Sequence, residues 1–144
     1  MNSESGHARL MGEIATFVNR GAAMITPKTL RSVHKKLPFL KLKFTEVDDP
    51  AYPHLVDQLE FLAAVVEDFA EGADDDLPYS TVAAAVFALI YAHRVVDLMP
   101  EAVRDFGHAD DSAVVRAALI EHQKALEAYA GRHEMKWEDI SLQP

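Results

Sequence analysis

The chain has 144 residues, of which 49% are hydrophobic, and it carries a formal net charge of −9. This length suits one domain with a sizeable core, and the apolar content argues against disorder over most of the chain. The absence of cysteine excludes disulfides, thiolate nucleophiles and zinc–thiolate sites, and it fits a reducing compartment. The N-terminus lacks the basic start and apolar core of a signal peptide. We therefore expect a cytoplasmic protein.

The charge is unevenly distributed. Residues 1–43 contain eight Lys and Arg against two acids, whereas residues 44–144 contain six against 21. The acidic remainder would repel phosphates, which disfavours nucleic acid as a partner. Six cations of the first part form a run that no acid interrupts: Lys28, Arg31, Lys35, Lys36, Lys41 and Lys43.

The first 50 residues are predicted to form a basic helical arm that packs on the body of the protein. Apolar residues at helical spacing predict a helix over about 8–19, with Gly21 weakening its end. Thr26 as an N-cap and Pro27 in the first turn then predict a short helix. This helix should end at about Lys36, before Pro38. Residues 38–43 alternate apolar and basic, and both an extended segment and a poor helix remain open.

Residues 51–144 are predicted to form the helical body. Apolar residues from Leu55 to Phe69 recur at helical spacing, with acids on the other faces, and Gly72 should end this helix. After an acidic turn over 73–76, residues 81–96 are apolar nearly all round, which is typical of a central helix. Its longest apolar run, 82–92, is shorter than the roughly 17–25 residues of a membrane span.

The last third of the chain predicts one or two helical turns over 100–106 and then a long final helix. Gly107 should end the helical turns, and Asp110 or Asp111 should begin the final helix, which runs to about Arg132. Trp137 and Ile140 are expected to pin the C-terminal tail to the body, and His133 is read as solvated surface. Because no period-two strand pattern occurs, we predict an all-α, compact bundle of four to five helices.

One segment of this body resembles a known family. Residues 88–116 are similar to the YkvA family of small bacterial proteins, in which an apolar helix ending in Tyr precedes a Pro-Ile-Asp-Leu-Ile-Pro-Asp turn, a Gly and a paired Asp. Val95 replaces the first proline of that turn, and Glu101 replaces its last aspartate. The positions of the family motif are Tyr91, Asp97, Leu98, Pro100, Glu101, Gly107, Asp110 and Asp111. The resemblance implies a helical domain over 51–144 but no established activity.

The acidic turn of this motif has two interpretations. In the first, Asp97 and Asp110 or Asp111 cap helices, and the turn is a structural corner. In the second, carboxylates and histidines converge on a divalent metal such as magnesium, manganese or iron. The candidate ligands are His93, Asp97, His108, Asp110 and Asp111. We expect no cofactor, with a divalent metal as the alternative.

The basic run also has two interpretations. Leu30, Val33 and Leu37 share a helical face, which favours a helix docked on the body with a basic outer face. Alternatively, the run binds an anionic membrane surface and places the protein at the inner face of the membrane. The sequence therefore favours a non-enzymatic interaction or accessory protein with a protein partner, self-association or a membrane surface. A small metal-dependent enzyme is the second hypothesis.

Overall fold

The computed structural model describes residues 3–47, 50–95, 98–99 and 110–143, and over these ranges the chain is entirely helical. Six α-helices and one short 3-10 helix are present there, without a strand, so the all-α prediction is confirmed while the helix count exceeds four to five. The elements are α1 (Ser3–Ala23), α2 (Pro27–Phe44), α3 (Leu55–Ala70), α4 (Tyr79–Ala92), α5 (Asp111–Glu121), α6 (Gln123–Arg132) and η3 (Trp137–Asp139).

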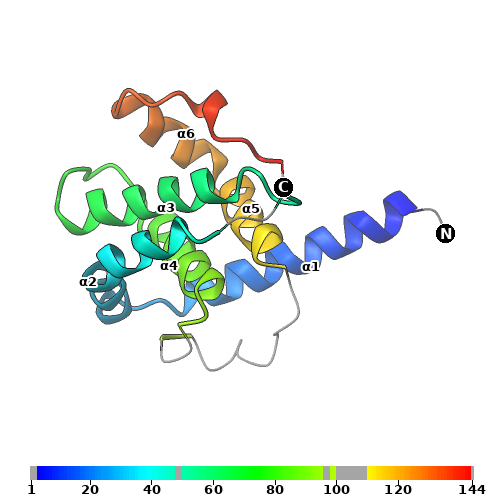
Figure 1. The fold of residues 1–144 in the computed structure, drawn as a ribbon, viewed down its shortest axis with the longest axis horizontal. Helices are drawn as coiled ribbons and strands as arrows, with labels where there is room; N and C mark the ends of the chain where they lie inside the picture. Colours follow the sequence, from blue (N-terminus) through cyan, green and yellow to red (C-terminus); the bar gives the residue numbers. More distant parts are fainter. Residues whose placement is uncertain (1–2, 48–49, 96–97, 100–109, 144) are drawn as a thin grey trace.

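Helix α4 is the centre of the bundle, as its sequence predicts. Every residue from Thr81 to Tyr91 is buried, and α1, α3 and α5 all pack against it (Figure 1). A helix that is apolar on all sides is stable only where other helices cover it and remove its side chains from water. It ends at Ala92, earlier than the predicted Val96. No helix in the described part of the chain combines the length and apolarity that crossing a membrane requires.

Helix α1 is longer than the sequence predicts and runs through Gly21 to Ala23. Gly21 is buried, and a Cβ atom placed there would lie 2.3 Å from Cε1 of Phe87 on α4. The absent side chain therefore lets α1 approach the central helix closely, and the Phe87 ring fills the space. The glycine serves helix packing here and does not end the helix.

Helix α2 corrects the prediction of a short helix that ends before Pro38. Thr26 is its N-cap, as predicted, and accepts a hydrogen bond from the Thr29 amide, but Pro38 lies inside the helix, which continues to Phe44. A proline within a helix costs about 3 kcal/mol. Continuation buries Leu40 and Phe44, and burial of each such side chain contributes roughly 1.5–3 kcal/mol, which offsets that cost.

The predicted long last helix is two helices, because the chain breaks at His122 between α5 and α6. Nδ1 of His122 lies 3.1 Å from Oγ1 of the buried Thr81 at the start of α4, so a tertiary contact accompanies this break. The tail behaves as predicted. The ring of Trp137 packs edge-on against Phe61 of α3 at 5.8 Å, and Ile140 packs against the core.

Candidate functional site

The structure describes about half of the predicted site residues. Tyr91, His93, Leu98, Asp110 and Asp111 are described, although Leu98 lies only partly buried against the core. The predictions for Asp97, Pro100, Glu101, Gly107 and His108 fall outside the described residues.

Asp110 is the N-cap of α5, which decides between the two candidates for that position. Its Oδ1 accepts a hydrogen bond of 2.9 Å from the Ser112 amide, and its Oδ2 accepts one from the Tyr52 hydroxyl. Asp111 lies in the first turn of the helix, where the macrodipole favours a negative charge. The capping part of the structural interpretation is therefore correct for Asp110.

Arg94 connects the end of α4 to this cap. Its backbone has a φ of 54°, a left-handed conformation that is uncommon outside glycine, and it directs the chain out of α4. Its guanidinium lies 4.9 Å from the centre of the Tyr91 ring, and Nη2 is 3.1 Å from Oδ1 of Asp111. These contacts help to hold a conformation that is costly for a residue with a side chain.

His93 is the C-cap of α4 and directly precedes Arg94 in the chain. Its ring stacks on Phe44 with centroids 5.0 Å apart, and its buried Nε2 has no hydrogen-bond partner. Burial and the nearby charge of Lys43 lower the pKa of His93 to about 4, so the imidazole is neutral at physiological pH. Burial raises the pKa of Asp111, against the effect of Arg94 and with that of Asp110.

We call Tyr52, His93, Arg94, Asp110 and Asp111 the His93 corner. All of them except Arg94 line a cavity of about 250 Å³. The walls of the cavity are Val47, Tyr52, Leu55, Leu59, Ala92, His93, Asp110 and Asp111. The structure thus brings three of the five predicted metal ligands to one cavity. Within the described ranges, however, no three acidic or histidine side chains are arranged to hold a metal ion.

The predicted basic run divides into two faces of α2. Toward α3, Nζ of Lys41 pairs with Glu67 at 2.5 Å, and Nε2 of His34 lies 3.5 Å from Glu71. Opposite the buried residues, five side chains recur at three- and four-residue spacing and are exposed. These are Lys28, Arg31, Lys35, Phe39 and Leu42, and we call them, with the flanking Lys36 and Lys43, the outer face of α2.

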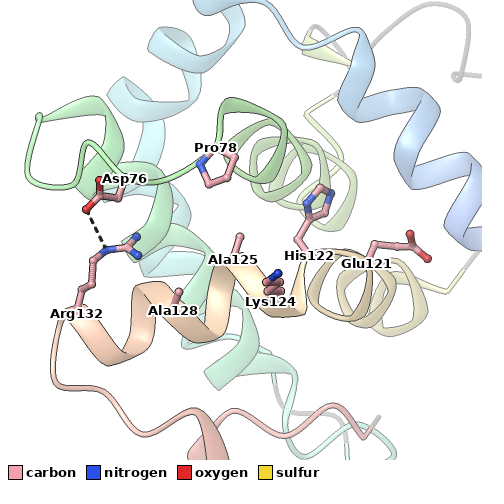
Figure 2. Close-up of a pocket in the computed structure, with 8 residues that line it drawn as sticks. All are labelled: Asp76, Pro78, Glu121, His122, Lys124, Ala125, Ala128 and Arg132. Carbon is pink, nitrogen blue, oxygen red and sulfur yellow. Dashed lines mark ion pairs between the residues drawn. The ribbon is translucent and has the colours of Figure 1, made fainter.

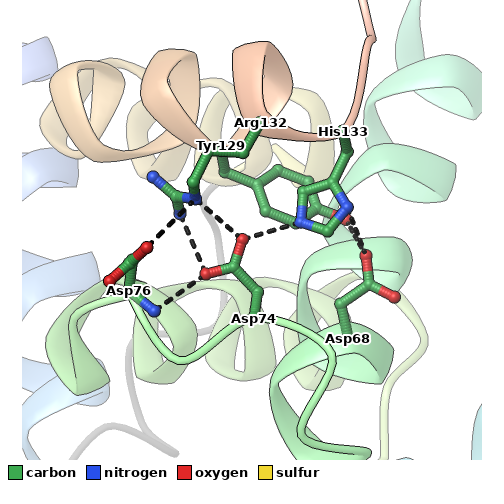
Figure 3. Close-up of polar contacts among 6 residues, drawn as sticks. All are labelled: Asp68, Asp74, Asp76, Tyr129, Arg132 and His133. Atoms are coloured by element: carbon green, nitrogen blue, oxygen red, sulfur yellow. Dashed lines mark hydrogen bonds and ion pairs between the residues drawn. The ribbon is translucent and has the colours of Figure 1, made fainter.

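The sequence analysis missed a charged cluster where the C-terminal ends of α3 and α6 meet (Figure 3). We call it the Asp74 cluster; its members are Asp68, Asp74, Asp76, Tyr129, Arg132 and His133. The side chain of Asp74 is only 2% exposed, and Arg132 binds both of its oxygens, with Nε and Nη2 at 2.9 and 3.0 Å. Nε2 of His133 lies 2.7 Å from the same carboxylate. The prediction that His133 is solvated surface is therefore wrong.

The hydrogen bonds of the cluster set the charge of Asp74. Burial alone would raise the pKa of Asp74, but hydrogen bonds from Arg132, His133 and the Asp76 amide lower it to about 2. Nearby, the Tyr129 hydroxyl donates to Asp68 over 2.5 Å, and Nδ1 of His133 lies 3.7 Å from that carboxylate. Each charge has a partner, so the cluster is a clamp that joins α6 to the α3–α4 turn.

A larger cavity of about 410 Å³ lies beside His122, between the start of α4 and α6 (Figure 2). It is lined by Asp76, Pro78, Glu121, His122, Lys124, Ala125, Ala128 and Arg132. Burial lowers the pKa of His122, against the effect of Glu121, and Thr81 already bonds its Nδ1. Two acids face two permanent cations around this cavity, and this balance selects neither an anion nor a cation.

Comparison of the chain with protein-family models, with curated proteins and with solved structures finds no match. The resemblance to the YkvA family therefore stays a prediction from residues 88–116. The functional argument depends on the geometry of the described residues alone.

Proposed function

We propose that this protein is a non-enzymatic accessory protein that binds an anionic membrane surface through the outer face of α2. One observation carries the proposal: the two most exposed large apolar side chains of the described chain lie on this basic face. Leu42 is 69% exposed and Phe39 is 58% exposed. An apolar side chain among cations suits a lipid interface, where the cations bind headgroups and the apolar groups enter the acyl boundary.

The cations of the outer face are available for such binding. Lys28, Arg31, Lys35 and Lys36 are exposed and make no ion pair with a described residue, unlike Lys41. Nζ of Lys43 lies 4.9 Å from the centre of the Phe39 ring, which joins the basic and apolar parts of the face. Each basic residue near an anionic membrane contributes on the order of 1 kcal/mol.

The position and composition of the face favour a membrane over an acidic protein. Helix α2 lies at the edge of the bundle (Figure 1), and its outer face lies opposite its buried residues. Lysine is depleted from protein–protein interfaces, whereas interfacial helices are rich in it. The many acids of residues 44–144 lie elsewhere in the sequence, and their repulsion from the lipid would orient the protein with α2 toward it.

The test is co-sedimentation of the full chain with phosphatidylcholine vesicles that contain or lack phosphatidylserine. We expect binding only to the anionic vesicles, with a decrease as salt is raised. The Lys35→Glu/Lys36→Glu variant should bind at least about 30-fold more weakly, since it loses two contributions of about 1 kcal/mol and gains two repulsions. Phe39→Ser/Leu42→Ser should also weaken binding but retain its dependence on salt.

The matched control is Lys124→Glu/Lys136→Glu, which changes the net charge equally at two exposed positions away from α2. It should retain most of the binding. Equal losses in the two charge-reversal variants would overturn the proposal, because net charge alone would then explain the effect. Retention of the wild-type protein in the supernatant at low salt would overturn it as well and would favour a protein as the occupant of this face.

A further inference from the structure

A second inference concerns the cavity of the His93 corner and is independent of the outer face of α2. Nε2 of His93 is one of the few buried side-chain polar atoms of the described structure that lack a hydrogen bond. Buried polar atoms in folded proteins nearly always have a partner, so this exception requires an explanation. His93 lines a cavity of about 250 Å³.

The walls of this cavity define the kind of ligand that would fit. One side is apolar, formed by Val47, Leu55, Leu59 and Ala92, and the other is polar, formed by Tyr52, His93, Asp110 and Asp111. Small-molecule sites combine apolar walls with a few polar groups in this way, and they usually measure about 300–1,000 Å³. A cavity just below that range suits a compact molecule with one polar end.

The charges around the cavity argue for an uncharged ligand. The carboxylates of Asp110 and Asp111 would repel an anion. The cation of Arg94 lies 3.1 Å from Asp111, and the charge of Lys43 acts on His93, so an added cation would meet repulsion there. The neutral imidazole has one nitrogen that donates and one that accepts, and a hydroxyl group can bond with either.

We propose that this cavity binds a compact, uncharged hydroxyl compound, whose apolar body lies against Leu55 and Leu59 and whose hydroxyl group bonds with Nε2 of His93. The cavity beside His122 provides no such arrangement, because Thr81 bonds Nδ1 of that ring and neither of its nitrogens is buried without a partner. The ligand would supply the partner that His93 lacks. An analogue without the hydroxyl group would leave Nε2 buried and unpaired, and this difference gives the site its selectivity.

The experiment uses benzyl alcohol as the probe and toluene as the analogue without a hydroxyl group. The imidazole nitrogens of the full-length protein are observed by long-range ¹H–¹⁵N NMR at neutral pH during titration with each compound. Benzyl alcohol should shift the nitrogen signals of His93 and leave those of His122 unchanged in the same spectra. It should also bind about tenfold more tightly than toluene, which corresponds to one net hydrogen bond.

The His93→Phe variant retains an aromatic ring for the stack on Phe44 and removes both nitrogens. It should bind toluene at least as well as the wild type and lose the preference for benzyl alcohol. If this variant does not fold, the wild-type shift and the preference over toluene still decide the proposal. Equal binding of the two compounds to the wild type, or an unchanged His93 signal, would overturn it. Broadening of the His93 signals by Mn²⁺ without a response to benzyl alcohol would also overturn it and would favour the metal interpretation.

Discussion

The Asp74 cluster and the His93 corner contain similar residues, namely aspartates, an arginine, a histidine and a tyrosine, but they differ in how completely those residues are paired. In the Asp74 cluster, the buried carboxylate is bonded by Arg132 and His133, and Tyr129 donates to Asp68. In the His93 corner, Arg94 reaches one carboxylate, and the nearby imidazole has an unpaired Nε2.

This difference separates a structural role from a binding role. A buried polar network in which each member is paired rigidifies the fold, and it has no remaining donor or acceptor for a ligand. Unpaired buried atoms beside a cavity cost stability, and a ligand that pairs with them recovers that cost. Ligand binding is therefore expected at the His93 corner, and fold stability is expected to depend on the Asp74 cluster.

The largest expected effect follows from removing the charge at the centre of the clamp. Asp74→Asn keeps the shape of the side chain but removes the buried anion that Arg132 and His133 bind. We expect a loss of about 3 kcal/mol in the free energy of unfolding, measured by urea denaturation. The control is Asp76→Asn, since this carboxylate is 79% exposed and lies 4.0 Å from Arg132, and it should cost less than about 0.5 kcal/mol. Equal losses in the two variants would contradict the role of Asp74.

A smaller effect distinguishes the two regions by pH. The pKa of His93 is about 4 in the folded protein and ordinarily 6.5, so the unfolded chain binds the proton first. Stability should therefore fall as the pH drops from about 6.5 to 4. The two pKa values correspond to about 3 kcal/mol, which the partial exposure of the ring to solvent reduces to about 2 kcal/mol, and His93→Phe should abolish this fall. The pKa of Asp74 is about 2 in the folded protein against 3.8 ordinarily, so its contribution is present above about pH 4 and is lost toward pH 2. Urea denaturation of His93→Phe and Asp74→Asn between pH 2 and 7 tests these two pH ranges. If both variants changed stability over the same pH range, the effects could not be assigned to His93 and Asp74 separately.

The same contrast explains how far the sequence predicted the fold. Helices α3 and α4 follow from local apolar spacing, and the cap at Asp110 follows from preferences that extend over a single turn. The passage of α2 through Pro38 could not be predicted in this way, because the local rule for proline opposes the burial of Leu40 and Phe44. The break at His122 has no glycine or proline to mark it, and its partner Thr81 is 41 residues away in the chain.

The candidate sites show the same limit. The sequence placed Asp74 in an acidic turn and His133 on the surface, because the side chain that each of them binds lies far away in the chain. Their pairing spans 59 residues, and it depends on how α6 packs across α3. One feature of the sequence pointed to a role for these residues: Arg132 and His133 are adjacent at the end of the final helix, where cations commonly bind the last backbone carbonyls. Conversely, the sequence motif predicted that His93, Asp110 and Asp111 belong to a site. A sequence pattern could not show that a cavity lies beside them or that Nε2 of His93 is unpaired.

The smallest expected effect compares one tyrosine from each region, since both donate a hydrogen bond to an aspartate. Burial and the Asp68 carboxylate raise the pKa of Tyr129, which remains a donor over the ordinary pH range. Tyr129→Phe should cost about 1.5 kcal/mol, because the hydroxyl is buried and its acceptor is charged. Tyr52 is only partly buried, so water can replace its bond to Asp110, and Tyr52→Phe should cost about 0.5 kcal/mol. Thermal denaturation of the two variants measures the difference. A greater loss for Tyr52→Phe would mean that the His93 corner, rather than the Asp74 cluster, is the more rigid part of the fold.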